Sequence, residues 1–184
     1  MKYLILTIYL FSQLGLASGW QSDPKQSQLT YSVNFEQLPI NGEFKTFTVD
    51  YAAEQQLRVV VSIASVDMGN SDINKAIRDV DWFDIKSHGQ AVFFSDKIIA
   101  VGEEHYVAEG HLQLKGISHP VNVPFSWQPA DNPQQSTKSA SMTGQLTLSR
   151  SDFAIGSPEW ASGDQIGLAV DVSFSVTMLS HAPQ

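Results

Sequence analysis

The sequence predicts an all-β protein, because short runs of alternating apolar and polar residues recur along the chain with turn residues between them. Alternation places successive side chains on opposite faces of a strand. The clearest run is the last, where seven apolar residues at every second position from Ile166 to Met178 alternate with small or polar residues. The chain has no cysteine, so a folded state must be stabilised by its apolar core rather than by disulfides.

Eight such runs follow one another, at about residues 29–35, 42–51, 57–63, 91–99, 106–114, 121–125, 145–149 and 166–178. Eight short strands separated by turns are typical of an antiparallel barrel or a sandwich. The interior of an eight-stranded barrel either packs solid or holds one small ligand. Alternation alone does not decide between these two interiors.

One segment breaks the strand pattern. Residues 71–84, SDINKAIRDVDWFD, place Ile73, Ile77 and Val80 at helical spacing, and Asn70 or Ser71 can cap the start. We expect one helix over residues 71–84, lying across the barrel. The polar stretch of residues 128–141 contains two prolines and is expected to form an exposed or disordered loop.

The first 19 residues predict a signal peptide. Lys2 is followed by a mostly apolar run over residues 3–16, and Ala17 and Gly19 are small residues of the kind a signal peptidase reads. The run is shorter than the ~20 apolar residues that a membrane anchor needs. We therefore expect cleavage before Trp20, export of the chain, and one domain over residues 20–184 without stable insertion in a membrane.

Charge and composition disfavour several classes of function. The formal net charge is −8 and no basic cluster is present, so we expect no nucleic acid partner. The five histidines show no helical ligand spacing and no cysteine can join them, so we expect no metal. The sequence has no nucleophile elbow, and the carboxylates Asp79, Asp81 and Asp84 would mostly face solvent on a helix. We therefore expect no catalytic residues.

Arg150 is the most informative charge. It has the same parity as Leu146 and Leu148, so the alternation turns its side chain inward. An inward arginine needs an anion or several carbonyls to offset its desolvation. The favoured interpretation is an ion pair with a carboxylate such as Asp152, or a position at the strand end that frees the side chain to solvent. The alternative is contact with the headgroup of a ligand.

Several strings together resemble the YceI-like family. They are GEFKTF (42–47), SIASVDMGN (62–70), DVDWFD (79–84), AVFFSDKI (91–98), YVAEGHLQLKGISHPVNVPF (106–125), and MTGQLTLSRSDFAIG (142–156) followed by Glu159-Trp160. The resemblance implies a lipocalin-like antiparallel barrel in the periplasm of a Gram-negative bacterium, which binds polyisoprenoid chains, quinone tails or other long amphiphiles. The DWFD, RSDFAIG and EW strings most resemble the subgroup associated with membrane b-type cytochromes, which suggests such a cytochrome as a partner.

On parity and resemblance together, we expect non-catalytic binding of a long-chain lipid, a polyprenyl phosphate or an isoprenoid quinone, for carriage or storage without a covalent cofactor. The expected lining residues are Phe35, Phe44, Ile63, Phe93, Leu112, Leu114, Phe125, Leu146, Phe153, Val170, Val172 and Phe174, with Arg150 and Trp160 as headgroup contacts. Two alternatives stay open. One is a barrel enzyme that uses Asp and His on a lipid-like substrate, and the other is a solid-core domain that contacts a membrane cytochrome.

Overall fold

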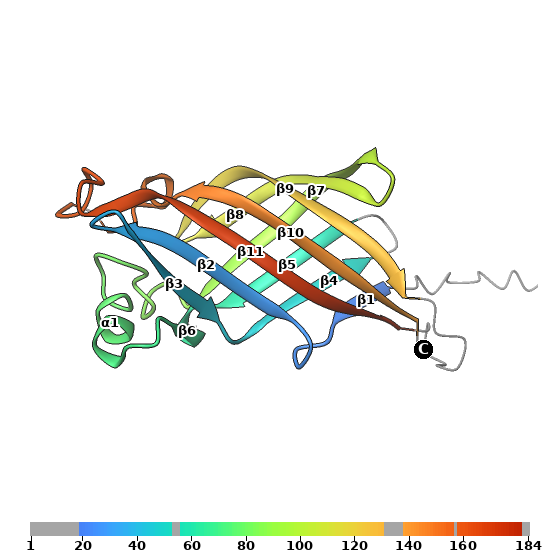
Figure 1. Cartoon of the computed structure of the whole chain (residues 1–184), viewed down its shortest axis with the longest axis horizontal. Helices are drawn as coiled ribbons and strands as arrows, with labels where there is room; N and C mark the ends of the chain where they lie inside the picture. The colour runs from blue at the N-terminus through green and yellow to red at the C-terminus, as the bar shows by residue number, and fades with distance from the viewer. Residues whose placement is uncertain (1–18, 53–55, 131–137, 157, 182–184) are drawn as a thin grey trace, which may run out of the picture.

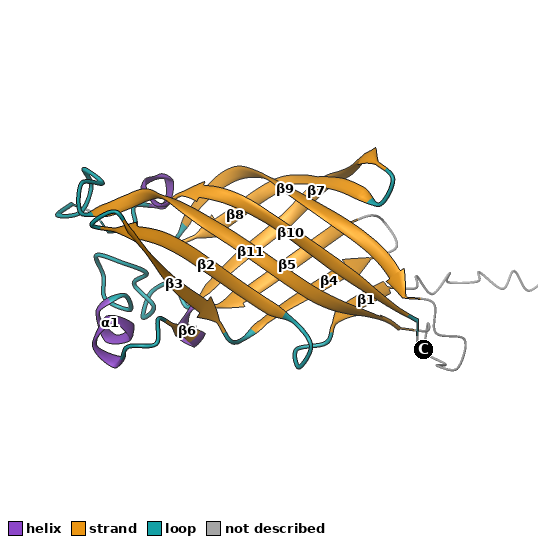
Figure 2. Cartoon of the chain, in the orientation of Figure 1, coloured by secondary structure: helices purple, strands orange, loops and turns teal. Residues whose placement is uncertain are grey.

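The computed structural model describes residues 19–52, 56–130, 138–156 and 158–181, so the predicted signal peptide lies outside the described residues except for Gly19. Strands dominate the molecule (Figures 1 and 2). They are β1 (Gly19–Ser22), β2 (Gln28–Phe35), β3 (Leu38–Phe44), β4 (Phe47–Ala52), β5 (Gln56–Ser62), β6 (Val66–Asp67), β7 (Gln90–Gly102), β8 (His105–Leu114), β9 (Ile117–Ala130), β10 (Ser139–Ser149) and β11 (Ile166–His181). The helical segments are α1 (Ser71–Ala76) and the 3-10 turns η1 (Ile63–Ser65) and η2 (Arg150–Phe153).

The sheet closes on itself because β11 is long enough to pair with two short strands along one edge. Its first part pairs with β2 and its last part pairs with β1, and β1 pairs in turn with β4. β3 and β4 share one strand position, as do β5 and β6, which η1 separates. The result is a closed antiparallel barrel with eight strand positions. The predicted all-β, lipocalin-like barrel is confirmed, and the sandwich is excluded.

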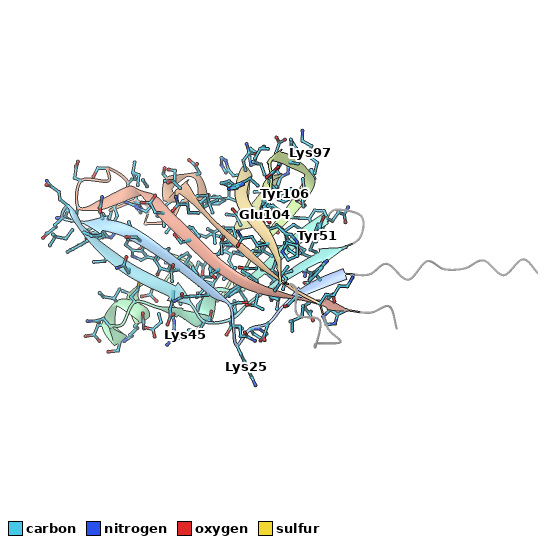
Figure 3. All side chains as sticks on the ribbon, turned by 45° about the vertical axis from the view of Figure 1, so that its right-hand side comes forward. Lys25, Lys45, Tyr51, Lys97, Glu104 and Tyr106 are labelled. Carbon is cyan, nitrogen blue, oxygen red and sulfur yellow. The ribbon has the colours of Figure 1, made fainter. Side chains whose placement is uncertain are left out.

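One end of the barrel is packed solid. A buried cluster there includes Ala108, Ala140 and Met178, each with at most 2% of its surface exposed. Aromatic rings extend the cluster: Trp20 meets Trp127 edge-on at 5.1 Å between ring centroids. Tyr51 and Tyr106 belong to the same end of the barrel (Figure 3). Any internal cavity must therefore lie toward the opposite end, beside α1.

The predicted helix over 71–84 is wrong in its length, since α1 ends at Ala76 and turns follow. A longer helix would continue the face of Ile73 and Ile77 with Val80 and acidic residues. Instead the chain turns back, with the Phe83 amide donating to the Ile77 carbonyl at 3.1 Å, and Val80 stays 66% exposed. The turn directs Trp82 and the adjacent Phe83 inward, where both are half-buried, and the apolar area that their rings remove from water compensates for the helical hydrogen bonds that are lost. None of the helical segments within the described residues is long and apolar enough to cross a membrane.

The predicted loop over 128–141 is also wrong at both of its ends. β9 continues to Ala130 and β10 begins at Ser139, with Pro129 opposite Ala140 in the ladder. Ala140 is 2% exposed and packs in the solid end of the barrel. Burial of this small apolar side chain favours strand structure for the polar residues around it. Residues 131–137 lie outside the described residues.

Candidate functional site: an apolar cavity in the barrel

A cavity of about 620 Å³ occupies the barrel between its solid end and the segment that follows β6. Side chains from β2 to β5 and from β7 to β11 form its wall, and Ile73, Ala76, Ile77, Trp82 and Phe83 close its far side. We call residues 71–88, which contain α1 and the turns after it, the cap segment. The volume lies in the range of small-molecule sites. The interior is therefore not a solid core.

Of the fourteen residues expected at the site, thirteen lie in the wall of the cavity. They are Phe35, Phe44, Ile63, Phe93, Leu112, Leu114, Leu146, Arg150, Phe153, Trp160, Val170, Val172 and Phe174. Phe125 is the exception: its ring stacks on Tyr106 at 5.4 Å in the solid end of the barrel. The alternation correctly predicts that Phe125 points into the barrel. Phe125 lies in the solid end, however, beyond the part of the barrel that the cavity occupies. Contact of the thirteen with a ligand stays a prediction.

Sequence reasoning missed several wall residues. Trp82 and Phe83 carry no periodic signal, because a non-helical turn presents them. Val59 and Val61 share the alternation of Ile63 and could have been named from it. Tyr31, likewise, has the parity of Phe35.

Arg150 is 4% exposed and sits at the end of β10, at the cap-segment end of the cavity. Its Nε donates to the Gly167 carbonyl at 2.9 Å, and its Nη1 donates to the Ile155 carbonyl at 2.7 Å. Its Nη2 donates to the carbonyls of Trp160 and of Ile166. Four of the five guanidinium N–H groups therefore hold the backbone of the loop after η2 and of the start of β11 in place.

The inward direction of Arg150 was predicted, but both forms of the favoured interpretation, an ion pair and release of the side chain to solvent, were wrong, because the buried side chain bonds to backbone carbonyls. Among the described residues, no carboxylate lies within ion-pair distance of Arg150, and Asp152 is exposed. Carbonyl dipoles offset the desolvation instead, and burial lowers the pKa of Arg150 from its ordinary value. The guanidinium also lies 5.9 Å from the centroid of the Trp82 ring, which places a cation–π contact between η2 and the cap segment.

Tyr31 is the second polar group of the wall. Its hydroxyl donates to the thioether sulfur of Met68 at 2.6 Å, and a thioether is a weak acceptor. Burial, and to a smaller extent the nearby charge of Asp67, raises the pKa of Tyr31, so the phenol stays neutral at ordinary pH. Its ring packs on Phe44 at 5.3 Å. An oxygen acceptor on a ligand would be a better partner for this hydroxyl than sulfur.

The wall offers little to catalysis. Among its described residues only Tyr31 and Arg150 carry titratable side chains. The Tyr31 hydroxyl donates to the sulfur of Met68, and the Arg150 guanidinium donates to backbone carbonyls. Ser149, the one hydroxyl-bearing aliphatic side chain of the wall, pairs with Ser151 at 2.7 Å rather than with a base. General acid–base chemistry needs a titratable group within hydrogen-bond reach of the reacting proton. The cavity has the character of a binding site.

The cavity reaches the surface at the cap-segment end. Phe35, the last residue of β2, and Ile73 of α1 both line the cavity, yet they are 40% and 39% exposed. The β2–β3 turn and α1 lie at this same end of the barrel (Figure 1). A ligand can therefore extend out between them.

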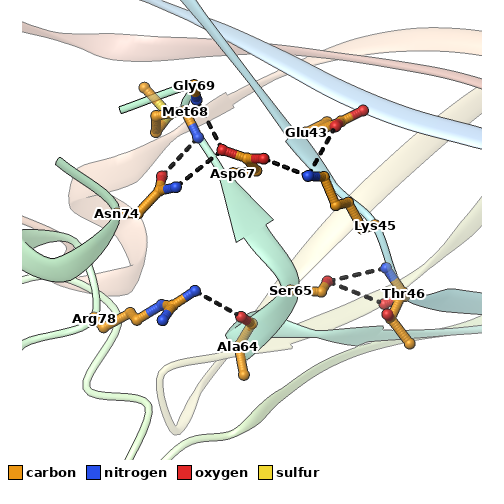
Figure 4. A network of polar contacts seen from close by, with 10 residues as sticks. All are labelled: Glu43, Lys45, Thr46, Ala64, Ser65, Asp67, Met68, Gly69, Asn74 and Arg78. Atoms are coloured by element: carbon orange, nitrogen blue, oxygen red, sulfur yellow. Dashed lines mark hydrogen bonds and ion pairs between the residues drawn. The ribbon is translucent and has the colours of Figure 1, made fainter. Parts of the chain in front are cut away.

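Asp67 fixes the position of the cap segment through a polar network (Figure 4). Its carboxylate pairs with Lys45 and accepts hydrogen bonds from the Asn74 amide at 2.9 Å and from the Gly69 backbone N–H at 2.8 Å. The Asn74 oxygen accepts in turn from the Met68 backbone N–H at 2.7 Å. Because Asn74 belongs to α1, the network links the helix to β6 and to the β3–β4 junction. It holds the pKa of Asp67 well below its usual range, chiefly through the Lys45 hydrogen bond.

A closed eight-stranded barrel with an apolar cavity, a solid end and a capped end defines the class of lipocalin-like ligand-binding barrels. Residues 20–178 match the YceI-like domain, and the chain belongs to the YceI-like family. The resemblance in the sequence is thereby confirmed at the level of the family.

Relatives and solved structures agree with this assignment. The UPF0312 protein of Vibrio campbellii is 30% identical over 137 residues, which cover 71% of this chain and 69% of the relative. BcnA of Burkholderia cenocepacia superimposes with a TM-score of 0.76 at 28% identity, over 85% of this chain and 98% of BcnA. A polyisoprenoid binding domain from Saccharophagus degradans, implicated in plant cell wall breakdown, has the same fold with a TM-score of 0.71 at 17% identity, over 89% of this chain and 98% of that domain.

Proposed function

We propose that the protein binds a long apolar lipid of the isoprenoid type in its barrel and carries or stores it without chemical change. The observation that supports this proposal best is the 620 Å³ cavity, whose described wall holds two titratable side chains among more than thirty residues. The polyisoprenoid binding domain with the same fold supports the choice of an isoprenoid. A catalytic function would need polar groups that this wall does not bring together.

The size of the cavity limits how much of the ligand it can hold. One water occupies about 30 Å³ of liquid and a methylene is of similar size, so the cavity has room for about 20 chain carbons. Each methylene transferred from water contributes about 0.8 kcal/mol, so ten buried carbons supply on the order of 8 kcal/mol before association costs. A longer chain would extend past Phe35 and Ile73 into solvent.

Two features of the wall suit a polar headgroup at the capped end. Arg150 keeps a positive charge with no carboxylate partner in the described chain, and one Nη1–H is left unused by the four carbonyls. Tyr31 can exchange its sulfur acceptor for a ligand oxygen. Both a polyprenyl phosphate and an isoprenoid quinone offer such oxygens. Trp160, beside Trp82 at 6.3 Å, is proposed to flank the headgroup.

Native mass spectrometry of protein purified from its own host tests the proposal. We expect a mass excess of one lipid per chain, which organic extraction removes. Redox-dependent absorbance of the extract would identify a quinone, and a phosphate assay would identify a polyprenyl phosphate. Protein that carries no lipid, and that shows no saturable binding when delipidated and mixed with either compound, would contradict the proposal.

We propose a periplasmic location, with the mature chain beginning at Trp20. The structure is compatible with this start, because Trp20 pairs with Ser180 of β11 and its ring packs on Trp127. N-terminal sequencing of protein from the periplasmic fraction of its host should read Trp20 first, whereas recovery of an intact Met1 would contradict export. Association with a membrane b-type cytochrome stays a prediction, which co-purification from solubilised membranes tests.

A further inference from the structure

A second cleft lies on the cap segment, away from the apolar wall. It has a volume of about 430 Å³ and is lined by Ser71, Asn74, Lys75, Arg78, Asp79, Ile85 and Lys86. The side chains of α1 thus divide between two sites: Ile73 and Ala76 line the barrel cavity, while Asn74 and Lys75 line the cleft. The cleft shares no lining residue with the apolar cavity.

The cleft carries uncompensated positive charge. Lys75, Arg78 and Lys86 line the cleft together with one carboxylate, Asp79, which gives its lining a formal charge of +2 in a chain whose formal net charge is −8. The ion pairs formed within the described residues involve Lys45, Lys97, His88 and His111, and none of the three cations of the cleft. Like charges that line one cleft repel one another, so binding of an anion there is electrostatically favourable.

Arg78 occupies a fixed position in the cleft and has donors to spare. Its Nη2 donates to the carbonyl of Ala64 at 3.0 Å, which ties the guanidinium to η1 on the barrel wall (Figure 4). Its Nε–H is buried and has no acceptor among the residues that the structure describes. A buried donor without a partner is uncommon in folded proteins and costs free energy. One anchored guanidinium beside two exposed ammonium groups is a suitable set for tetrahedral oxyanions, because the guanidinium is a planar fork of donors while the lysines add point charges.

We infer that the cleft formed by Lys75, Arg78 and Lys86 binds a phosphate group. Asn74 contributes to its shape rather than to binding, because its amide is already engaged by Asp67 and by the Met68 backbone. The Ser71 hydroxyl, on the first residue of α1, is a further donor. The phosphate could be free in solution or part of a lipid headgroup. The inference does not depend on occupation of the barrel by a lipid.

Binding of inorganic phosphate to the delipidated protein tests the inference. Amide chemical shifts of residues 71–86 should change saturably with phosphate at low ionic strength, and the affinity should fall as sodium chloride is added. Lys75→Gln combined with Lys86→Gln should weaken binding at least tenfold. Both lysines are exposed, so this variant should keep the fold. Arg78→Gln should weaken binding similarly, with thermal melting as the check that loss of the Ala64 contact has not unfolded the chain.

Lys25→Gln is the control, because Lys25 is an exposed lysine in the β1–β2 turn (Figure 3) and does not line the cleft. It should bind phosphate as the wild type does. Shifts that do not saturate, or that are equal in the wild type and the double lysine variant, would overturn the inference.

Farnesyl monophosphate distinguishes the two sources of the phosphate. If the cleft holds a lipid headgroup, farnesyl monophosphate should bind at least tenfold more tightly than inorganic phosphate and should lose that advantage in the double lysine variant. If the cleft takes free phosphate, the two affinities at the cleft should be equal. Saturable phosphate binding in a protein that retains no lipid would leave the cleft established while contradicting the proposed function of the barrel.

Discussion

The ring of Phe174 on β11 lies against the α-carbon of Gly144, its cross-strand partner on β10. A β-carbon at position 144 would lie less than 3.0 Å from the Phe174 ring and from the carbonyl oxygen of Pro124. Tyr31 has the same relationship to Gly42, its partner on β3. In both pairs a glycine lets an aromatic side chain lie along the wall of the cavity, where a larger residue would force it away.

Gly144→Ala should therefore destabilise the protein by about 1–3 kcal/mol, the usual cost of overpacking, because the Pro124 backbone cannot move aside as a side chain can. Urea denaturation measures the change. Gly102→Ala is the control: Gly102 also lies in a strand, but a β-carbon there would meet nothing closer than 3.8 Å. It should change stability by no more than about 0.5 kcal/mol. Equal effects of the two substitutions would show that close approach at Gly144 is unimportant.

Arg150→Met should be among the most damaging single changes. It removes the donors of four backbone carbonyls, and each hydrogen bond to a charged group contributes about 1.5–3 kcal/mol. We expect a loss of at least about 3 kcal/mol in the free energy of unfolding. Hydrogen exchange should become faster in residues 154–167, before the rest of the barrel. Arg150→Lys should recover little, because an ammonium group cannot reproduce the planar fork.

Arg58→Gln is the control for this prediction, since Arg58 is exposed on β5 and its loss should be nearly neutral. If Arg150→Met unfolds at the urea concentration of the wild type, the carbonyl contacts contribute no net stability and the main function of Arg150 lies with the ligand.

The barrel could be predicted from the sequence because the alternation of apolar and polar residues in each strand is a property of neighbouring residues. Alternation at Val170, Val172 and Phe174 follows from the geometry of a strand, and no tertiary contact is needed to read it. Depth along the barrel axis has no such signal. Phe125 has the inward parity of Val123, yet it belongs to the solid end while Val123 lines the cavity.

The cap segment was predicted poorly for a related reason. Its helical periodicity is real through Ile77, but the chain then follows the burial of Trp82 and Phe83, which depends on the barrel mouth they cover. The partners of Arg150 were equally beyond local pattern. They are backbone carbonyls of residues between 155 and 167. Every residue has such a carbonyl, so the amino-acid sequence does not show which ones accept hydrogen bonds from Arg150.

The Asp67 network predicts a dependence of stability on pH. Because the folded-state pKa of Asp67 is lowered, its ionised form favours the folded state; this contribution is present above the unfolded pKa of about 3.9 and is lost as the pH falls below it. Asp67→Asn should therefore lower the urea midpoint at about pH 7, and the difference from the wild type should shrink as the pH falls from about 4 to about 2.

Glu103→Gln serves as the control, since Glu103 is an exposed carboxylate in the β7–β8 turn. Its substitution should leave the pH dependence as in the wild type. A difference between Asp67→Asn and the wild type that persists unchanged at low pH would show that the charge of Asp67 does not stabilise the cap segment.

Val172→Trp separates a ligand cavity from a packed core. Val172 lines the cavity, between Leu146 on β10 and Tyr31 on β2, so an indole there should enter space that the chain of a lipid needs. Overpacking of a solid core typically costs 1–3 kcal/mol. In an open cavity we expect a smaller loss of stability together with loss of retained lipid. Thermal melting of the delipidated protein and the mass of extractable lipid are the two measurements.

Met178→Trp provides the contrast within the same strand. Met178 is fully buried in the solid end and is not part of the cavity wall, so its substitution should lower the melting temperature strongly. Lipid retention by whatever fraction stays folded should be normal, because the cavity is unchanged. The two variants should thus show opposite patterns. If Val172→Trp instead melts far below the wild type and still retains lipid normally, the face of Val170, Val172 and Phe174 is packed core, and the ligand must bind elsewhere.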